Sequence, residues 1–520
     1  MNAAPYSRRK LKSYFIALVA GFLGLALAGA VLLFAFWPFR YREVHPLLQQ
    51  TFRSRVEMKS YHRTYFPHPG YVAEGVVIYR HGDTQIPALA TIERMVVEGS
   101  WINLVVHPHM LYQIRLSGLH VQIPPPGTAA RRIDFDQGVV SSSRQKIEIK
   151  AIIADGTTLD VLREHGAPPL RFYFSTLEVY NVQPDQPLTF SAKVVIPRPQ
   201  GTVLANGSIG PASTSNYAQT PLSGAFSLSA ADLSKLHGIS GTAAATGHYS
   251  GTFSKIDVLG KAAIPDFHAG SAQPVPLNAE YHLTVNATNG DVEIQNAQVQ
   301  SRASVISARG LIAGSPKKLS ITLATKNSPV GDLLKMIQRG TPSVTGTVSF
   351  KAAVNMDGGP GDFLQRMHLK GNISLAHMGF IKADTQHEMD AFSSRVRKGP
   401  SGDTKNHPTR VTADARSQTR FLNGIAYFPD LHVALPGARA RVHGDLNLID
   451  GNMRMTGKVM LERDISRAAT GWKSLLLKPL IPFFRHQSAG AIVSIAVTGT
   501  PQHPSISQIL LPGNAGPPPP

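Results

Sequence analysis

Two short motifs in the sequence have residue types and spacing suited to nucleophilic catalysis. Residues 143–146 and 315–318 each place a serine three positions before a lysine, a spacing that some serine enzymes use. The companion motifs of those enzymes are missing, and both segments lie beside turn-forming residues. A chance match explains them better than a catalytic site does.

Histidines in the sequence could bind a metal ion or transfer protons. His107 lies two residues before His109, His62 lies near His68, and residues 387–390 combine a histidine with two acidic residues. Imidazole is a common metal ligand. However, 20 histidines in 520 residues make close pairs expected by chance, and residues 387–390 fit the solvated face of a helix. We expect no metal site and no cofactor.

Composition argues against further classes of protein. The chain has no cysteine, which excludes disulfides, thiolate zinc sites, iron–sulfur clusters and cysteine nucleophiles. It has no phosphate-binding loop, dinucleotide-binding glycine pattern, zinc-protease motif or nucleophile elbow. The net charge of +19 is spread along the chain without interleaved aromatic residues, so it favours anionic lipid headgroups over nucleic acid. We expect neither an enzyme nor a nucleic-acid-binding protein.

The N-terminal segment predicts a membrane anchor. Residues 14–36 carry no charge, and 23 helical residues span about 35 Å, enough for a bilayer core of about 30 Å. Four basic residues precede this stretch, so we expect residues 1–12 in the cytoplasm and residues 38–520 outside it. A cleaved signal peptide is the alternative, but its apolar region would normally have about 7–15 residues. The residues expected to contact the membrane at the ends of this anchor (13–37) are Tyr14, Phe15, Phe36 and Trp37.

The rest of the chain predicts strands, because apolar and polar residues alternate with period two. Alternation is nearly unbroken over residues 344–356. Residues 441–448 and 453–461 alternate as well and are joined through Asp450–Gly451, which predicts a β-hairpin. A three-residue motif, in which glycine follows two positions after an apolar residue, recurs at irregular separations, as in Leu222–Gly224. Glycine there permits bends or the close approach of another backbone.

Helices are expected to be few and short. They are predicted over residues 100–106, 329–337 and 383–397, and an apolar segment over 472–485 is kinked by its prolines. Residues 397–409 predict a loop, and the proline-rich tail 513–520 predicts an extended or disordered end. The predicted fold is mainly β: a long curled antiparallel sheet with an apolar groove, in an N-terminal part (38–200) and a C-terminal part (201–512).

The order of several segments resembles the AsmA-like proteins, a family of bacterial envelope proteins anchored in the inner membrane. The segments that carry the resemblance are residues 87–94, 96–104, 114–121, 328–334, 344–347 and 369–375. The resemblance implies a periplasmic protein of outer-membrane biogenesis, similar to the chorein-type bridge proteins that move phospholipid between membranes. It implies no catalytic residues. The chain departs from the family in two ways: it is shorter than the longest members, and its proline-rich tail lacks an evident outer-membrane docking segment.

Alternation over many strands places the apolar side chains on one face, which monomers seldom leave uncovered unless it binds something. We therefore expect a groove that binds or conducts phospholipid, with the inner membrane and possible outer-membrane or envelope assembly proteins as partners. The predicted lining residues are Val348, Phe350, Val354, Met356, Val442, Leu446, Leu448, Met453, Met455, Val459, Leu461, Val493, Ile495 and Val497. Two alternatives stay open: a structural scaffold whose sheet closes on itself, and an enzyme with a site that the sequence does not reveal.

Overall fold

The protein is described from a computed structural model. The described residues are 37–52, 54–80, 88–106, 110–124, 148–162, 168–183, 185–211, 217–236, 238–270, 272–314, 318–337, 342, 344–358, 366–398, 410–447, 451–461, 492–500 and 503–508. The predicted anchor residues Tyr14, Phe15 and Phe36, lining residue Leu448, the 472–485 segment and the 513–520 tail lie outside them.

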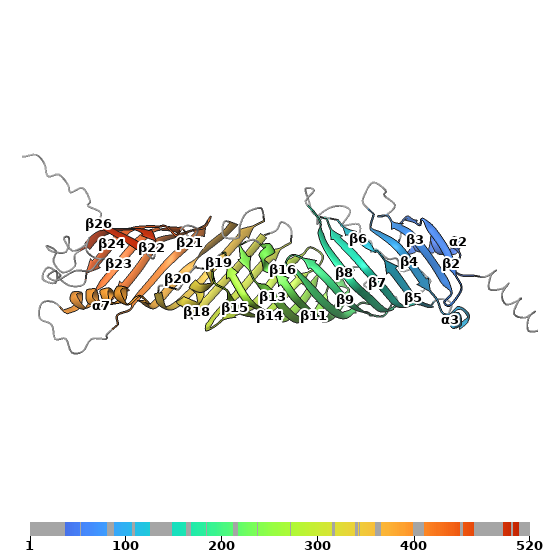
Figure 1. Cartoon of the computed structure of the whole chain (residues 1–520), viewed down its shortest axis with the longest axis horizontal. Helices are drawn as coiled ribbons and strands as arrows, with labels where there is room; N and C mark the ends of the chain where they lie inside the picture. Colours follow the sequence, from blue (N-terminus) through green and yellow to red (C-terminus); the bar gives the residue numbers. More distant parts are fainter. Residues whose placement is uncertain are drawn as a thin grey trace, which may run out of the picture. The chain divides into compact units, whose positions relative to one another are not determined.

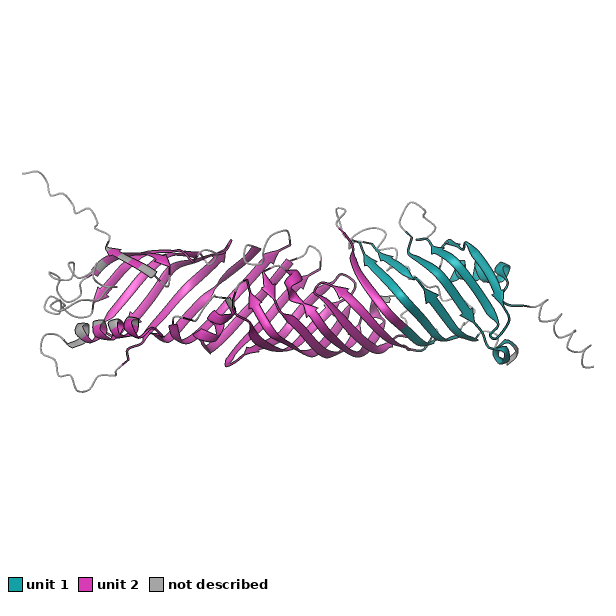
Figure 2. Cartoon of the chain, in the orientation of Figure 1, with its two compact units in different colours: residues 1–167, 178–186 teal, residues 168–177, 187–520 magenta. Residues whose placement is uncertain are grey.

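The described chain is mainly β, with a large mixed sheet and few short helices, as the alternation predicts. Two compact units can be distinguished (Figure 2): unit 1 comprises residues 1–167 and 178–186, and unit 2 comprises residues 168–177 and 187–520. Strand β8 (Leu170–Val182) contributes residues to both. The division between the two units therefore falls near residues 168–187, and the sequence-based parts 38–200 and 201–512 stay a prediction.

Unit 1 contains the first strands and two short helices. Its elements are α2 (Tyr41–Phe52), β1 (Val56–Glu57), β2 (Ser60–Thr64), β3 (Gly70–Ile78), β4 (Ala90–Glu98), α3 (Trp101–Val106), β5 (Met110–Ser117), β6 (His120–Ile123) and β7 (Glu148–Val161). Alternate residues of β3 and β4, such as Ala73 and Met95, pack on one face into a buried core. Val44 of α2 is buried in the same core, so this helix covers part of that face of β3 and β4.

Two strand pairings in unit 1 correct the prediction of a purely antiparallel sheet. Strand β7 pairs in parallel with β5 and with β6. Parallel neighbours need a crossover connection rather than a tight turn, and residues 124–147 separate β6 from β7. Alternation of apolar and polar residues is the same whichever way a strand runs, so the sequence pattern does not distinguish parallel from antiparallel pairing.

Unit 2 is a meander in which successive strands pair antiparallel. Its strands are β9 (Leu188–Pro197), β10 (Gln200–Ile209), β11 (Pro221–Asp232), β12 (Ile239–Ser240), β13 (Thr242–Thr252), β14 (Lys255–Ala269), β15 (Val275–Asn286), β16 (Asp291–Ser301), β17 (Ser304–Ala313), β18 (Lys318–Pro329), β19 (Val344–Asp357), β20 (Met367–Phe380), β21 (Ala413–Leu422), β22 (Ile425–Leu435), β23 (Ala438–Asn447), β24 (Met453–Leu461), β25 (Ile492–Thr500) and β26 (His503–Gln508). Each strand from β9 to β26 pairs with the next one along the chain, except that β11 pairs with β13 and the short β12 pairs with β14. Figure 1 shows this order as a regular progression of strands.

The predicted hairpin between residues 441–448 and 453–461 is confirmed. Strands β23 and β24 pair with Leu446 opposite Met453, and Gly451 in the connection has φ of +78°. A positive φ is easily adopted by glycine, which explains its place in the turn.

The three helices predicted in the body of the chain are also confirmed. They are α3, α5 (Val330–Ile337) and α7 (Ala383–Lys398). Helix α2 is not among the predicted helices; it contains Pro46, and proline normally disrupts a helix interior. The 3-10 helices η2 (Tyr217–Gln219) and η3 (Leu233–Leu236) complete the helical elements of the described residues. None of the described helices combines the length and the hydropathy needed to cross a bilayer.

Candidate functional site

The candidate site is one face of the unit 2 sheet, which we call the apolar face. Residues opposite each other in paired strands point to the same side of a sheet. In the C-terminal strands Leu446 lies opposite Met453, and Met455 lies opposite Val497. The register therefore brings the predicted lining residues of β23, β24 and β25 onto this single face.

The predicted lining residues of β19 lie on the same face, which continues across the strands in between. Val354 is opposite Leu369 of β20, and Leu369 is opposite Phe421 of β21. Phe421 is in turn opposite Ala426, whose partner on β23 is Leu446. The predicted lining residues of β19 and those of β23–β25 are thus linked through β20, β21 and β22.

The apolar face also extends through the first half of unit 2, which the predicted lining residues do not cover. Val354 faces Ile321 of β18, and the register continues strand by strand to β9. The members found this way include Phe190, Ala205, Phe226, Tyr249, Val258, Leu283, Ile294, Ile306 and Ile321. The same period-two alternation could have identified them, but frequent glycine and alanine on these strands weaken it.

Burial differs between the two edges of the apolar face. Near one edge, beside η3, α5 and α7, the side chains are buried, including Leu233, Val275, Val330 and Leu461. Toward the opposite ends of the strands the apolar side chains stay partly exposed, and Ile312 of β17 is 38% exposed. One edge of the face is therefore closed by short helices and the other remains accessible.

The predicted lining residues divide in the same way. Val348, Val354, Val442, Leu461 and Ile495 are buried, whereas Phe350, Met356, Leu446, Met453, Met455, Val459 and Val497 are only partly buried. Val493 lies on the same face by its register with Val459. Partly buried side chains on a continuous apolar face offer contact area to an apolar ligand.

Aromatic rings lie across glycines on the apolar face. A Cβ atom at Gly247 would come within 2.8 Å of Phe226, and one at Gly260 within 2.5 Å of the Tyr281 hydroxyl. Burial raises the pKa of Tyr281, so its hydroxyl stays neutral. In the first half of the face, aromatic rings therefore occupy the space beside glycines of the neighbouring strands.

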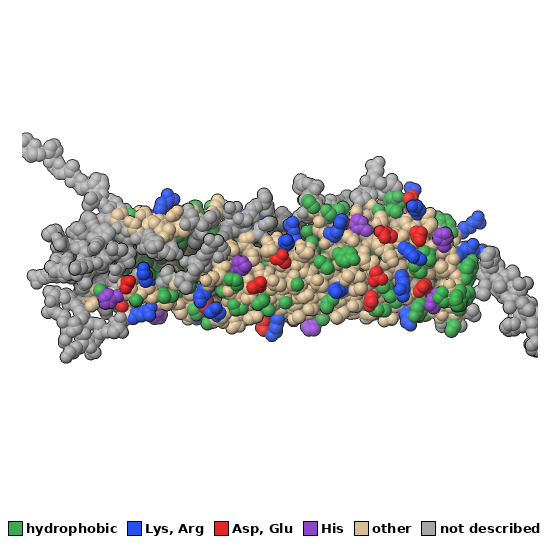
Figure 3. Space-filling model, viewed as in Figure 1, with side chains coloured by type: hydrophobic (Ala, Val, Ile, Leu, Met, Phe, Trp, Pro, Cys, Tyr) green, Lys and Arg blue, Asp and Glu red, His purple; other side chains and the backbone are tan. Residues whose placement is uncertain are grey.

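The opposite face of unit 2 is polar. Its strands carry residues such as Lys261, Glu280 and Arg441 there, and Figure 3 shows charged, histidine and hydrophobic side chains scattered over the surface in view. A hollow of about 690 Å³ lies over β11 and β13–β16, where Lys261 Nζ lies 2.8 Å from Glu280 Oε1. The lysine lowers the pKa of Glu280 by a hydrogen bond and by its charge. An ionised, exposed carboxylate of this kind is not poised as a general acid.

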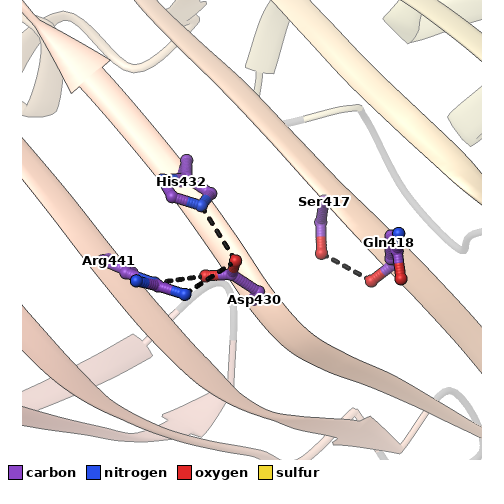
Figure 4. Close-up of polar contacts among 5 residues, drawn as sticks. All are labelled: Ser417, Gln418, Asp430, His432 and Arg441. Carbon is purple, nitrogen blue, oxygen red and sulfur yellow. Dashed lines mark hydrogen bonds and ion pairs between the residues drawn. The ribbon is translucent and has the colours of Figure 1, made fainter.

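A polar cluster on that face joins Asp430, His432 and Arg441 (Figure 4). Arg441 donates two hydrogen bonds to the Asp430 carboxylate, at 2.7 and 3.1 Å, and His432 Nε2 lies 3.0 Å from Asp430 Oδ2. The hydrogen bonds from Arg441 and then His432 lower the pKa of Asp430. Ser417 instead donates to the carbonyl of Gln418, and its register opposite Leu431 places it on the apolar face. Ser417, His432 and Asp430 therefore do not assemble a serine–histidine–aspartate triad.

The histidines considered as metal ligands do not converge among the described residues. His62 and His68 are exposed, and the ring of His68 stacks on Tyr112. His387 is exposed on α7, while His107 and His109 lie outside the described residues. Within the described ranges, no group of three potential metal ligands occurs.

Trp37, which the sequence predicts at the membrane end of the anchor, has contacts within unit 1. It is 2% exposed, and its ring packs against Phe39, Tyr65 and Trp101. The aromatic contacts make it part of the unit 1 core, because burial of a large ring is strongly favourable. An aromatic residue just after an apolar segment fits both roles, and only the tertiary contacts distinguish them.

No protein-family model matches the sequence, and no curated protein matches it either. The functional argument therefore depends on the geometry of the apolar face.

Proposed function

We propose that this protein is held in the bacterial inner membrane by its N-terminal segment and that the apolar face of unit 2, in the periplasm, binds or conducts phospholipid. In this proposal it serves outer-membrane biogenesis, and the AsmA-like resemblance of the sequence points the same way. The inner membrane supplies the lipid, and an envelope protein is a possible further partner.

The observation that carries the proposal is the continuity of the apolar face. Paired positions from Phe190 on β9 to Val497 on β25 share it, and one of its edges remains accessible. Acyl chains would lie along this face while headgroups stay in water. Burial contributes about 0.8 kcal/mol per CH₂ group, and a similar affinity at every strand would leave no position that traps the lipid.

A structural scaffold is the second candidate. The specific observation in its favour is the burial of Val348, Val354 and Val442, which are already covered by the protein's own side chains. A scaffold would need the accessible part of the face to be covered as well, whereas Met455 and Phe350 remain partly exposed. An envelope enzyme is the least supported candidate, because the polar groups described above do not form a reactive site.

The proposal is tested by photocrosslinking at two neighbouring residues of β24. A photoreactive amino acid replaces Met455 on the apolar face in one variant and Arg454, which is exposed on the polar face, in the other. The full chain is produced in bacteria, irradiated, purified and analysed for covalently bound phospholipid. We expect phospholipid on the Met455 variant and little on the Arg454 variant. Equal yields, or no lipid at either position, would favour the scaffold.

A further inference from the structure

An exposed hydrophobic patch lies at the start of the described chain, in unit 1. Phe66 is 88% exposed and Ile102 is 73% exposed, while Tyr65 and Trp101 are each 39% exposed. We call these four side chains the α3 patch, since Trp101 and Ile102 belong to α3. Figure 1 places α3 at one end of unit 1, and Figure 3 shows hydrophobic side chains gathered at that end.

The α3 patch is held in place by defined contacts. The buried ring of Trp37 lies 4.7 Å from the ring of Tyr65 and 5.8 Å from that of Trp101, measured between centroids. The Trp101 indole Nε1 donates a hydrogen bond of 3.2 Å to the carbonyl of Pro67. These contacts join α3 to residues 65–69, the loop between β2 and β3 that carries Tyr65 and Phe66.

The position of the patch along the chain indicates what covers it. Trp37 follows residue 36 directly, and residue 36 is the last of the uncharged stretch 14–36 that predicts the anchor. Ring contact with Trp37 therefore keeps the patch beside the point where the predicted anchor ends. Tryptophan, tyrosine and phenylalanine side chains favour the interfacial region of a bilayer, and Arg40 and Arg42 follow closely with charges suited to anionic headgroups.

We propose that the α3 patch inserts into the interfacial region of the same phospholipid bilayer that holds the N-terminal anchor. This inference rests on the membrane anchoring included in the proposed function. The bilayer would then contact the chain at two places, and unit 1 would be fixed against the membrane surface rather than tethered to it by a flexible link.

Single-cysteine labelling tests the inference, because the natural chain has no cysteine. The full chain carrying Ile102→Cys is labelled with an environment-sensitive fluorophore and reconstituted into vesicles of phosphatidylethanolamine and phosphatidylglycerol. Phe66→Cys provides a second position in the patch. Leu204→Cys is the matched control, since Leu204 is 52% exposed on the polar face of β10 in unit 2. We expect a blue shift at positions 102 and 66, and loss of emission when nitroxide-labelled lipid is included, with neither change at position 204.

The alternative outcomes are distinguishable. If the protein floats with the vesicles but labels at 102 and 66 report water as the control does, the patch inference is overturned and the anchor stands. If those labels are shielded but lipid nitroxide does not quench them, a protein surface covers the patch, either residues 1–36 or a second copy, and the inference is also overturned. If the protein does not float with the vesicles, the membrane anchoring itself fails.

Discussion

The ring of Tyr249 lies across Gly224, its register partner on the neighbouring strand β11. A Cβ atom at Gly224 would come within 2.7 Å of Tyr249 Cζ, so only glycine leaves room for the ring. The Tyr249 hydroxyl reaches further and donates a hydrogen bond of 3.0 Å to the carbonyl of Asn206 on β10. One aromatic side chain thereby connects three neighbouring strands of the sheet, β10, β11 and β13, on the apolar face.

Replacing Gly224 by alanine should therefore destabilise unit 2. The added methyl group overlaps Tyr249 and the Asn206 carbonyl oxygen, and overpacking of this kind typically costs about 1–3 kcal/mol. Urea unfolding followed by circular dichroism measures the change. Tyr249→Ala and the double variant complete a mutant cycle, in which the two changes should be non-additive because the residues are in contact. Additive effects would contradict the proposed overlap.

The alternation of apolar and polar residues predicts the strands and distinguishes their solvent-exposed face from their apolar face. A strand with one solvent-exposed face imposes a period of two on the sequence. Residues 344–356 are an example, confirmed as most of β19. The extension of the face through β11–β14 was harder to see, since Gly224, Gly247 and Gly260 occupy apolar positions there. These glycines fit the apolar face because aromatic rings from neighbouring strands occupy the space beside them. The parallel pairings of β7 and the burial of Trp37 depend on tertiary contacts, which no local pattern encodes.

Thr419 offers a test of how the apolar face tolerates polar groups. Its hydroxyl oxygen is buried and has no hydrogen-bond partner among the described residues, and its register partner Gly371 places it on the apolar face. Thr419→Val keeps the shape and removes the hydroxyl, so it should stabilise the protein by about 1 kcal/mol. The measurement is the free energy of unfolding, with Ser417→Ala as the control because Ser417 donates a hydrogen bond of 2.7 Å to the Gln418 carbonyl. Destabilisation by Thr419→Val would indicate an unrecognised partner.

The cluster of Asp430 and Arg441 should make a small, pH-dependent contribution to stability. Hydrogen bonds from Arg441 and His432 lower the pKa of Asp430 in the folded state. A lowered folded-state pKa gives stability that is present above the unfolded value of about 3.9 and is lost as the pH falls through the folded value. Arg441→Gln should therefore be less stable than the natural protein at neutral pH, and the difference should shrink as the pH falls below about 4. Unfolding measured across this range checks the sign, and a difference that grows in acid would refute it.

Phe350 distinguishes a conduit from a set of separate binding sites. It lies on β19, on the apolar face between the strands that carry Phe226 and Met455. Aspartate in an apolar path costs about 2.5–3.5 kcal/mol on a membrane-insertion scale, so Phe350→Asp should slow lipid movement past this strand at least roughly tenfold.

The measurement is transfer of fluorescent phospholipid between donor and acceptor vesicles by the purified full chain. Lys351→Asp is the control, since residue 351 follows directly and is exposed on the polar face. Photocrosslinking of lipid at Phe226 and at Met455 should persist in Phe350→Asp, because binding on either side of β19 needs no passage across it. Unchanged transfer in a folded Phe350→Asp protein would show that lipid does not move along the face, and an equal loss in Lys351→Asp would assign the effect to charge alone. Loss of transfer in Phe350→Asp only, with crosslinks retained on both sides, is the result that a continuous path requires.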